Sequence, residues 1–153
     1  MARSLAVLSV AVLVAAVSAA PIPSLRGSDV EGSNTLTLRL QKCNSSAPWT
    51  IHGLWPNWKE NCASSFECSE VNSILPQLED NWMSCEGDTN CAFWAHEWEK
   101  HGSCTKLAVV DFFTETLTLA ENYRAQCPDS GDECSLCFDE SYNPLDPSKC
   151  TYQ

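Results

Sequence analysis

The sequence lacks several features that define common protein classes. It has one long apolar run, at the extreme N-terminus, which excludes a polytopic membrane protein. It has no internal repeat or low-complexity tract, and its 6 glycines exclude a collagen-like chain. Basic residues are scarce, since 9 lysines and arginines stand against 20 acidic residues and give a net charge of −11. The 153 residues are enough for about one domain, and 6 tryptophans exclude wholesale disorder.

The apolar run at the N-terminus has the composition of a secretory signal peptide. Arg3 supplies a positive charge, residues 5–17 are too short to span a bilayer comfortably, and Val17-Ser18-Ala19 favours cleavage before Ala20. Cleavage after Ala20 and an uncleaved anchor are the alternatives. We therefore expect residues 1–19 to be a signal peptide, 20–34 a polar lead-in, and 35–153 a single domain that has no membrane segment.

Cysteine is abundant, with 10 residues, all after the apolar run. This density is typical of disulfide-bonded secreted proteins, whereas structural zinc is disfavoured because Cys134-Ser135-Leu136-Cys137 has no second half-site. Cys85 and Cys91 are close enough in sequence to form a local pair. Asn44-Ser45-Ser46 is a glycosylation sequon, which also fits secretion.

Hydrophobic periodicity predicts short strands and helices. Strands are expected where Leu36, Leu38 and Leu40 alternate with polar residues, over Pro48–Leu54, and around Leu136–Phe138. Helices are expected in three stretches. These are a short helix capped by Ser69 and interrupted by Pro76, a helix from Phe93 ended by Gly102, and a longer one over Leu107–Gln126 with an apolar face of Val109, Val110, Phe113, Leu117, Ala120 and Tyr123.

Two segments carry residues that are suited to proton transfer. In Trp49-Thr50-Ile51-His52-Gly53-Leu54-Trp55-Pro56, a histidine stands in an apolar stretch beside a glycine. Histidine can lend or take a proton near neutrality, and a buried structural histidine is the alternative. The second segment is Phe93–Gly102. Helical spacing there places His96 and Lys100 on one face and Glu97 and His101 on the neighbouring row.

The second segment is expected to be held against the core by Trp94 and Trp98, although a solvated helix face is the alternative. A zinc protease motif is rejected, because H-E-x-x-H needs histidines four apart and His96 and His101 are five apart. We predict no metal site.

Two histidines with a lysine and a carboxylate suit phosphoryl transfer. One histidine can take a proton from a hydroxyl nucleophile, another can protonate the leaving oxygen, and the lysine can stabilise charge on the phosphoryl oxygens. RNA carries its own nucleophile, the 2′-OH, so this chemistry needs no cofactor and spares DNA. Trp55 and Trp58 are candidates to stack on a base, with ordinary packing as the alternative.

Residues 49–56 and 93–104 resemble the two active-site segments of the T2 family of secreted, acid-favouring ribonucleases. The resemblance implies an α+β fold, with helices packed around an antiparallel sheet. It also implies an endoribonuclease that cleaves single-stranded RNA through a 2′,3′-cyclic phosphate, in lysosomes or outside the cell. The implied roles are general acid for His52, general base for His101, stabilisation of the phosphorane for Glu97 and Lys100, phosphate binding for His96, and base binding for Trp55. We expect a monomer.

The resemblance also implies two disulfides, Cys62–Cys104 and Cys137–Cys150. The remaining cysteines allow three pairings and are left open: Cys43, Cys68, Cys127 and Cys134. The chain lacks the aromatic-Pro pair that usually precedes the first segment, and the helix and strands that usually stand between Gln126 and Cys127. We therefore expect a shortened, incomplete version of the family's domain.

A net charge of −11 repels RNA, so the binding of RNA by this chain needs an explanation, and two are open. Either a positive site around His96, Lys100 and His101 outweighs the mean field, or the protein works in acid, where histidines and carboxylates are protonated. The shortening leaves a second function open, an inactive secreted relative that acts as a binding or signalling protein. The complete catalytic set favours the enzyme.

Overall fold

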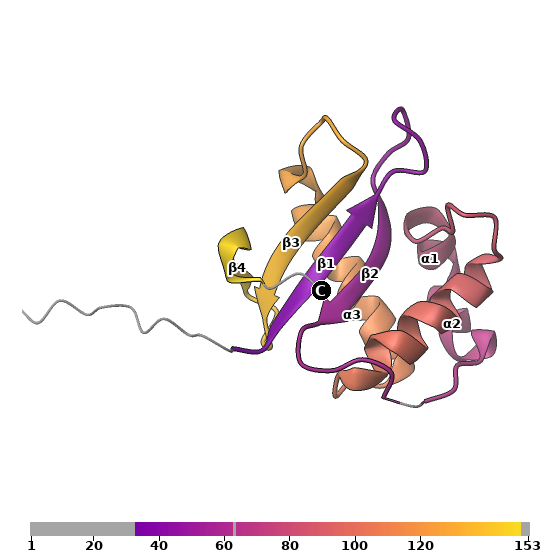
Figure 1. The fold of residues 1–153 in the computed structure, drawn as a ribbon. Helices are drawn as coiled ribbons and strands as arrows, with labels where there is room; N and C mark the ends of the chain where they lie inside the picture. The colour runs from indigo at the N-terminus through magenta and orange to yellow at the C-terminus, as the bar shows by residue number, and fades with distance from the viewer. Residues whose placement is uncertain (1–32, 63, 151–153) are drawn as a thin grey trace, which may run out of the picture. The chain divides into compact units, whose positions relative to one another are not determined.

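The computed structural model describes residues 33–62 and 64–150 (Figure 1). The expected signal peptide and most of the expected lead-in lie outside these residues. Within them, helices pack against an antiparallel four-stranded sheet and 5 disulfides link the chain. The predicted α+β class is confirmed. No helix in the described part of the chain has the length and apolarity needed to cross a membrane.

The sheet has the strand order β2-β1-β3-β4, with antiparallel neighbours throughout. Its strands are β1 (Thr35–Gln41), β2 (Thr50–Pro56), β3 (Glu133–Asp139) and β4 (Pro144–Leu145). Because side chains alternate along a strand, the leucines of β1 share one face with Leu136 and Phe138 of β3. This face is buried against α3 (Val109–Tyr123), which lies behind the sheet in Figure 1.

The helices begin and end at positions that differ from the expected ones. The first stretch is a 3₁₀ helix, Cys68–Ile74, which follows Glu67 rather than Ser69. Pro76 lies in the first turn of the next helix, α1 (Leu75–Asn81), instead of interrupting a helix, because the missing N–H of a proline is not needed there. Short 3₁₀ helices also cover Gly102–Cys104, Arg124–Gln126 and Pro147–Lys149.

The helix with the catalytic candidates, α2, spans Asn90–Lys100 and so begins before the expected Phe93. Thr89 is its N-cap, and the Thr89 hydroxyl accepts a hydrogen bond of 3.2 Å from the backbone N–H of Ala92. The helix is fixed to the core by Trp94 and Trp98, as predicted from the sequence, since these side chains are 1% and 4% exposed.

The disulfides include both pairs that the resemblance implied, Cys62–Cys104 and Cys137–Cys150. The expected Cys85–Cys91 pair is wrong. Cys85 is bonded to Cys43 and Cys91 to Cys68, while Cys127 is bonded to Cys134. The short interval between Cys85 and Cys91 contains a turn at Gly87 (φ +90°) and the start of α2, so each thiol meets a different part of the chain.

Candidate functional site

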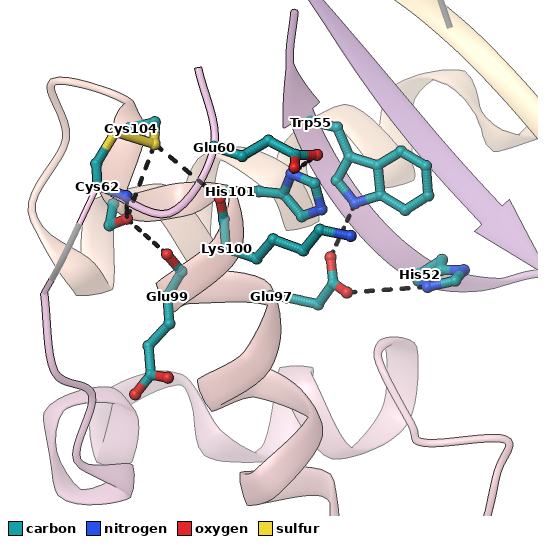
Figure 2. A network of polar contacts seen from close by, with 10 residues as sticks. His52, Trp55, Glu60, Cys62, Glu97, Glu99, Lys100, His101 and Cys104 are labelled. Atoms are coloured by element: carbon teal, nitrogen blue, oxygen red, sulfur yellow. Dashed lines mark hydrogen bonds and ion pairs between the residues drawn. A yellow bond between two sulfur atoms is a disulfide. The ribbon is translucent and has the colours of Figure 1, made fainter. Parts of the chain in front are cut away.

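His52 lies at an irregularity in the ladder between β1 and β2. Arg39 is paired with Gly53 and Leu40 with Ile51, so His52 is an extra residue without a partner across the ladder. Such a bulge bends the strand locally and redirects a side chain. It leaves Ile51 in the core and turns the His52 side chain toward α2 (Figure 2).

A buried carboxylate, Glu97, joins β2 to α2. The Trp55 indole Nε1–H donates a hydrogen bond of 2.9 Å to Glu97 Oε2, and His52 Nε2 lies 3.8 Å from Glu97 Oε1 (Figure 2). The Glu97 side chain is only 2% exposed. Trp55 and His52 on β2 therefore each contact one of the two carboxylate oxygens of Glu97 on α2.

Gly53 makes this close approach possible. A Cβ at this position would overlap Glu97 Oε2 and Trp55 Nε1. Gly102 has a similar role at the other end of the segment, where a Cβ would be 2.6 Å from the Trp98 ring and 2.8 Å from the Phe112 ring. Gly102 was predicted to end the helix; α2 ends at Lys100, and Gly102 instead permits tight packing beneath His101.

His101 follows α2 directly, and its ring stacks on Trp55, with centroids 5.0 Å apart and an interplanar angle of 23°. The ring of His52 contacts the same indole edge-on, at 5.1 Å. One tryptophan thus holds both catalytic candidates. Figure 2 shows the Lys100 ammonium directed toward the space between Trp55 and Glu97.

Burial shifts the protonation of the central groups in opposite directions. Desolvation raises the pKa of Glu97 from 4.5 to about 7, against the hydrogen bond from Trp55 and the charge of Lys100. Desolvation, then the charge of Lys100, lowers the pKa of His101 from 6.5 to about 3. His101 Nδ1 is buried without a hydrogen bond in the described residues, and the closest carboxylate oxygen paired with it, Glu60 Oε1, is 3.9 Å away. The pKa of His52 is lowered from 6.5 by burial and then by Arg39.

A cavity of about 410 Å³ opens beside His52 and Glu97. His96 lines it from the exposed side of α2, and Phe93 lines it one turn earlier, 5.7 Å from the His52 ring. The other lining residues are Gln41, Ser84, Cys85, Glu86, Asp88 and Ala92. Trp55 is not among them, because its ring is in contact with His52, His101 and Arg39.

The structure brings the predicted catalytic, phosphate-binding and base-binding residues into one region: His52, Trp55, His96, Glu97, Lys100 and His101. Trp58, the second stacking candidate, lies at a different cavity and donates to the Cys104 carbonyl at 3.1 Å.

The region also contains Arg39, Glu60 and Phe93, which the sequence analysis did not single out. The sequence contained a weak indication that two of these residues belong to the site, because Arg39 is a cation in an alternating strand and Phe93 precedes Glu97 by one helical turn. Glu60 lies in an irregular segment, and nothing in the sequence indicated that it belongs to the site. No group of three or more histidine, cysteine or carboxylate side chains within the described ranges is placed to hold a metal ion.

The model of the Ribonuclease T2 family matches residues 31–127. The chain belongs to this family. The match contains both segments of the site and ends before β3.

Individual T2 relatives resemble parts of the chain. Ribonuclease 1 of Arabidopsis thaliana is 38% identical over an alignment of 88 residues that covers 50% of this chain and 38% of the relative. Ribonuclease T2 of Homo sapiens is 43% identical over an alignment of 60 residues that covers 37% of this chain and 23% of the relative. The aligned part of the chain therefore spans well under half the length of these relatives. RNase NT, solved in complex with 5′-AMP, has a similar fold with a TM-score of 0.63 at 21% identity, over 80% of this chain and 94% of that one.

Proposed function

We propose that the protein is a metal-independent endoribonuclease that cleaves single-stranded RNA through a 2′,3′-cyclic phosphate. His101 takes the proton of the 2′-OH, the 2′-oxygen attacks the adjacent phosphorus, and His52 gives a proton to the departing 5′-oxygen. Lys100 offsets the negative charge that builds on the phosphoryl oxygens, and Glu97 donates to them when it is protonated. DNA has no 2′-OH and is not cleaved.

The observation that carries this proposal is the contact of His52 and His101 with one indole, whose N–H holds the carboxyl group of Glu97. The pKa of His101, about 3, keeps its imidazole neutral and able to accept a proton across the acid range. His52 must be protonated to act as the acid, and its pKa lies below 6.5. The reactive combination of protonation states therefore exists between about pH 3 and the pKa of His52, which predicts an acid optimum.

The cavity beside His52 has room for part of a nucleotide. Phe93 offers an aromatic face for a base, and His96 stands where it can contact a phosphate. The base-binding role expected for Trp55 becomes a scaffolding role in this proposal, since its ring is already in contact with protein groups.

We propose further that the protein acts as a monomer after entry into the secretory pathway, in lysosomes or outside the cell. The disulfides of the described chain fit that compartment. Asn44 is exposed in the connection between β1 and β2, within its sequon, and is proposed to carry a glycan.

The test is release of acid-soluble nucleotides from single-stranded RNA by oxidatively refolded protein, between pH 4 and pH 8, with and without EDTA. His52→Ala and His101→Ala are compared with Glu99→Gln, which changes an exposed carboxylate on the same helix. We expect EDTA-resistant cleavage that is strongest in acid, is lost in both histidine variants by roughly 100-fold or more, and is retained in the control. A folded wild-type protein that binds RNA without cleaving it would instead support the inactive binding protein.

A further inference from the structure

Arg39 links the candidate site to β3, the neighbour of β1 on the side away from β2. It lies on β1, between β2 and β3 (Figure 1), and its register partners are Gly53 and Ser135. The guanidinium lies over the indole of Trp55, with Cζ 5.4 Å from the ring centroid. It also donates to Ser135 Oγ and pairs with Glu133 Oε2 at 2.6 Å.

We propose that Arg39 is a positioning residue for the reaction proposed above. Anchored on β3 by Glu133 and Ser135, its guanidinium holds the Trp55 indole against the catalytic groups and keeps a fixed positive charge close to His52. This inference rests on the proposed function for its catalytic meaning, whereas the charge and its effect on His52 can be measured without any activity.

The first part of the argument is mechanical. The Trp55 N–H donates to Glu97, and the Trp55 ring stacks on His101, so a shift of the indole would move both groups. A planar guanidinium can lie against an aromatic ring while its N–H groups donate hydrogen bonds to other side chains around the ring. The Arg39 side chain is 20% exposed, which weakens the competition from water.

The second part is electrostatic. The charged and titratable groups that act on His52 are Arg39 from β1, Glu133 from β3, His96 and Glu97 from α2, and Glu86 from the segment before α2. Arg39 opposes protonation of His52, and Glu133 and Glu86 favour it. A lowered pKa makes His52 a stronger acid but narrows the pH range in which it carries its proton. Burial is the largest cause of the lowered pKa of His52, and the balance between Arg39 and Glu133 adjusts this pKa further. The alkaline limit of cleavage should therefore move when either charge is removed.

The test compares Arg39→Gln with Glu133→Gln, because each substitution breaks the same ion pair but removes the opposite charge. The chain has 3 histidines, so their ring resonances can be followed separately by NMR during a pH titration. We expect Arg39→Gln to raise the pKa of His52 by about half a pH unit and Glu133→Gln to lower it by a similar amount. Ser135→Ala removes a hydrogen bond without changing charge and should leave this pKa in place.

In the cleavage assay, the alkaline limit of kcat/KM should move with the pKa of His52 in each variant. Arg39→Lys separates the two parts of the proposal, since it keeps the charge but not the planar contact. We expect this variant to keep the wild-type pKa of His52 and to lose kcat, as Trp55 is held less well.

Shifts of the His52 pKa in the same direction in both Gln variants, or no shift in either, would overturn the proposal, because loss of a purely structural pair would act alike in both. Glu133 is 63% exposed, so the Glu133→Gln variant and Arg39→Lys remain decisive if Arg39→Gln does not fold. Absence of cleavage by the folded wild-type protein contradicts the proposed function alone, and the titration then decides the role of Arg39.

Discussion

Replacing Glu97 by Gln should stabilise the protein at alkaline pH. The Glu97 side chain is 2% exposed and its pKa is about 7 in the folded protein, against an ordinary 4.5. The folded protein thus binds more protons than the unfolded chain between these values, and stability falls as the pH rises through this window. At about 1.4 kcal/mol for each pH unit, the ionised carboxylate destabilises the fold by about 3 kcal/mol above pH 7.

Glutamine has the same shape, stays neutral, and keeps an oxygen that can accept from the Trp55 N–H. We expect the free energy of unfolding of Glu97→Gln to equal that of the wild type near pH 4 and to exceed it by up to about 3 kcal/mol at pH 8. The measurement is urea unfolding of the disulfide-intact proteins, followed by tryptophan fluorescence at several pH values. Glu99→Gln is the matched control, with an expected change within about 0.5 kcal/mol.

His101 contributes to the pH dependence of the free energy of unfolding with the opposite sign to Glu97, which makes this prediction more specific. Its folded pKa of about 3 lies below the ordinary 6.5, so the unfolded chain binds more protons between these values and stability falls as the pH falls. In the wild type the two slopes oppose each other between pH 4.5 and 6.5. Without Glu97, stability should rise with pH over this range. A variant that is no more stable than the wild type at pH 8 would refute the reasoning, and a gain that is independent of pH would show that packing, not ionisation, is responsible.

Two further predictions concern packing and disulfides. Gly53→Ala should lower the free energy of unfolding by about 1–3 kcal/mol and reduce the initial cleavage rate, because the new Cβ overlaps the side chains of the site; unchanged kinetics would contradict the assigned geometry. Removing the Cys43–Cys85 bridge, which joins residues 42 apart, should lower the free energy of urea unfolding by about 4 kcal/mol in the chain-entropy model. Removing Cys127–Cys134, which joins residues 7 apart, should lower it by about 2.5 kcal/mol, and the reverse order would contradict this account.

The sequence predicted the elements whose periodicity is clear. β1 alternates cleanly because one of its faces meets α3, and α2 is marked by Trp94 and Trp98. The long helix was predicted correctly as an element, but its buried face was predicted only in part. Its apolar residues form a broad face opposite a polar stripe that includes Asp111, Thr114 and Thr118. The buried part of this face includes Phe112, Thr116 and Leu119 beside the expected Phe113 and Ala120. Thr116 can lie in the core because its hydroxyl donates to the Phe112 carbonyl at 2.8 Å.

Other parts of the site were beyond sequence reasoning for a physical reason. The spacing of two cysteines in the sequence does not show where their side chains point, so the short interval between Cys85 and Cys91 predicted a pair that does not form. The contact of Arg39 with Trp55 depends on strand order, which brings β2 and β3 to either side of β1. Helical spacing was enough to predict the relative placement of His96, Glu97 and Lys100, because one helix carries all three. The placement of His52 beside Glu97 depends on the packing of β2 against α2, which spacing does not give.

The extra residue in β2, His52, separates the proposed general acid from the regular pairing of the strand that carries it. If His52 is passed over, Ile51, Gly53 and Leu54 alternate inward and outward against β1 as in an unbroken strand. The histidine is thus an insertion into an otherwise regular element, and the core beneath it does not depend on its side chain. The backbone of His52 does serve the core, because its carbonyl accepts a hydrogen bond of 2.9 Å from the indole N–H of the buried Trp82. A substitution at position 52 would therefore remove the imidazole and leave the core in place, whereas deletion of the residue would also remove the partner of Trp82.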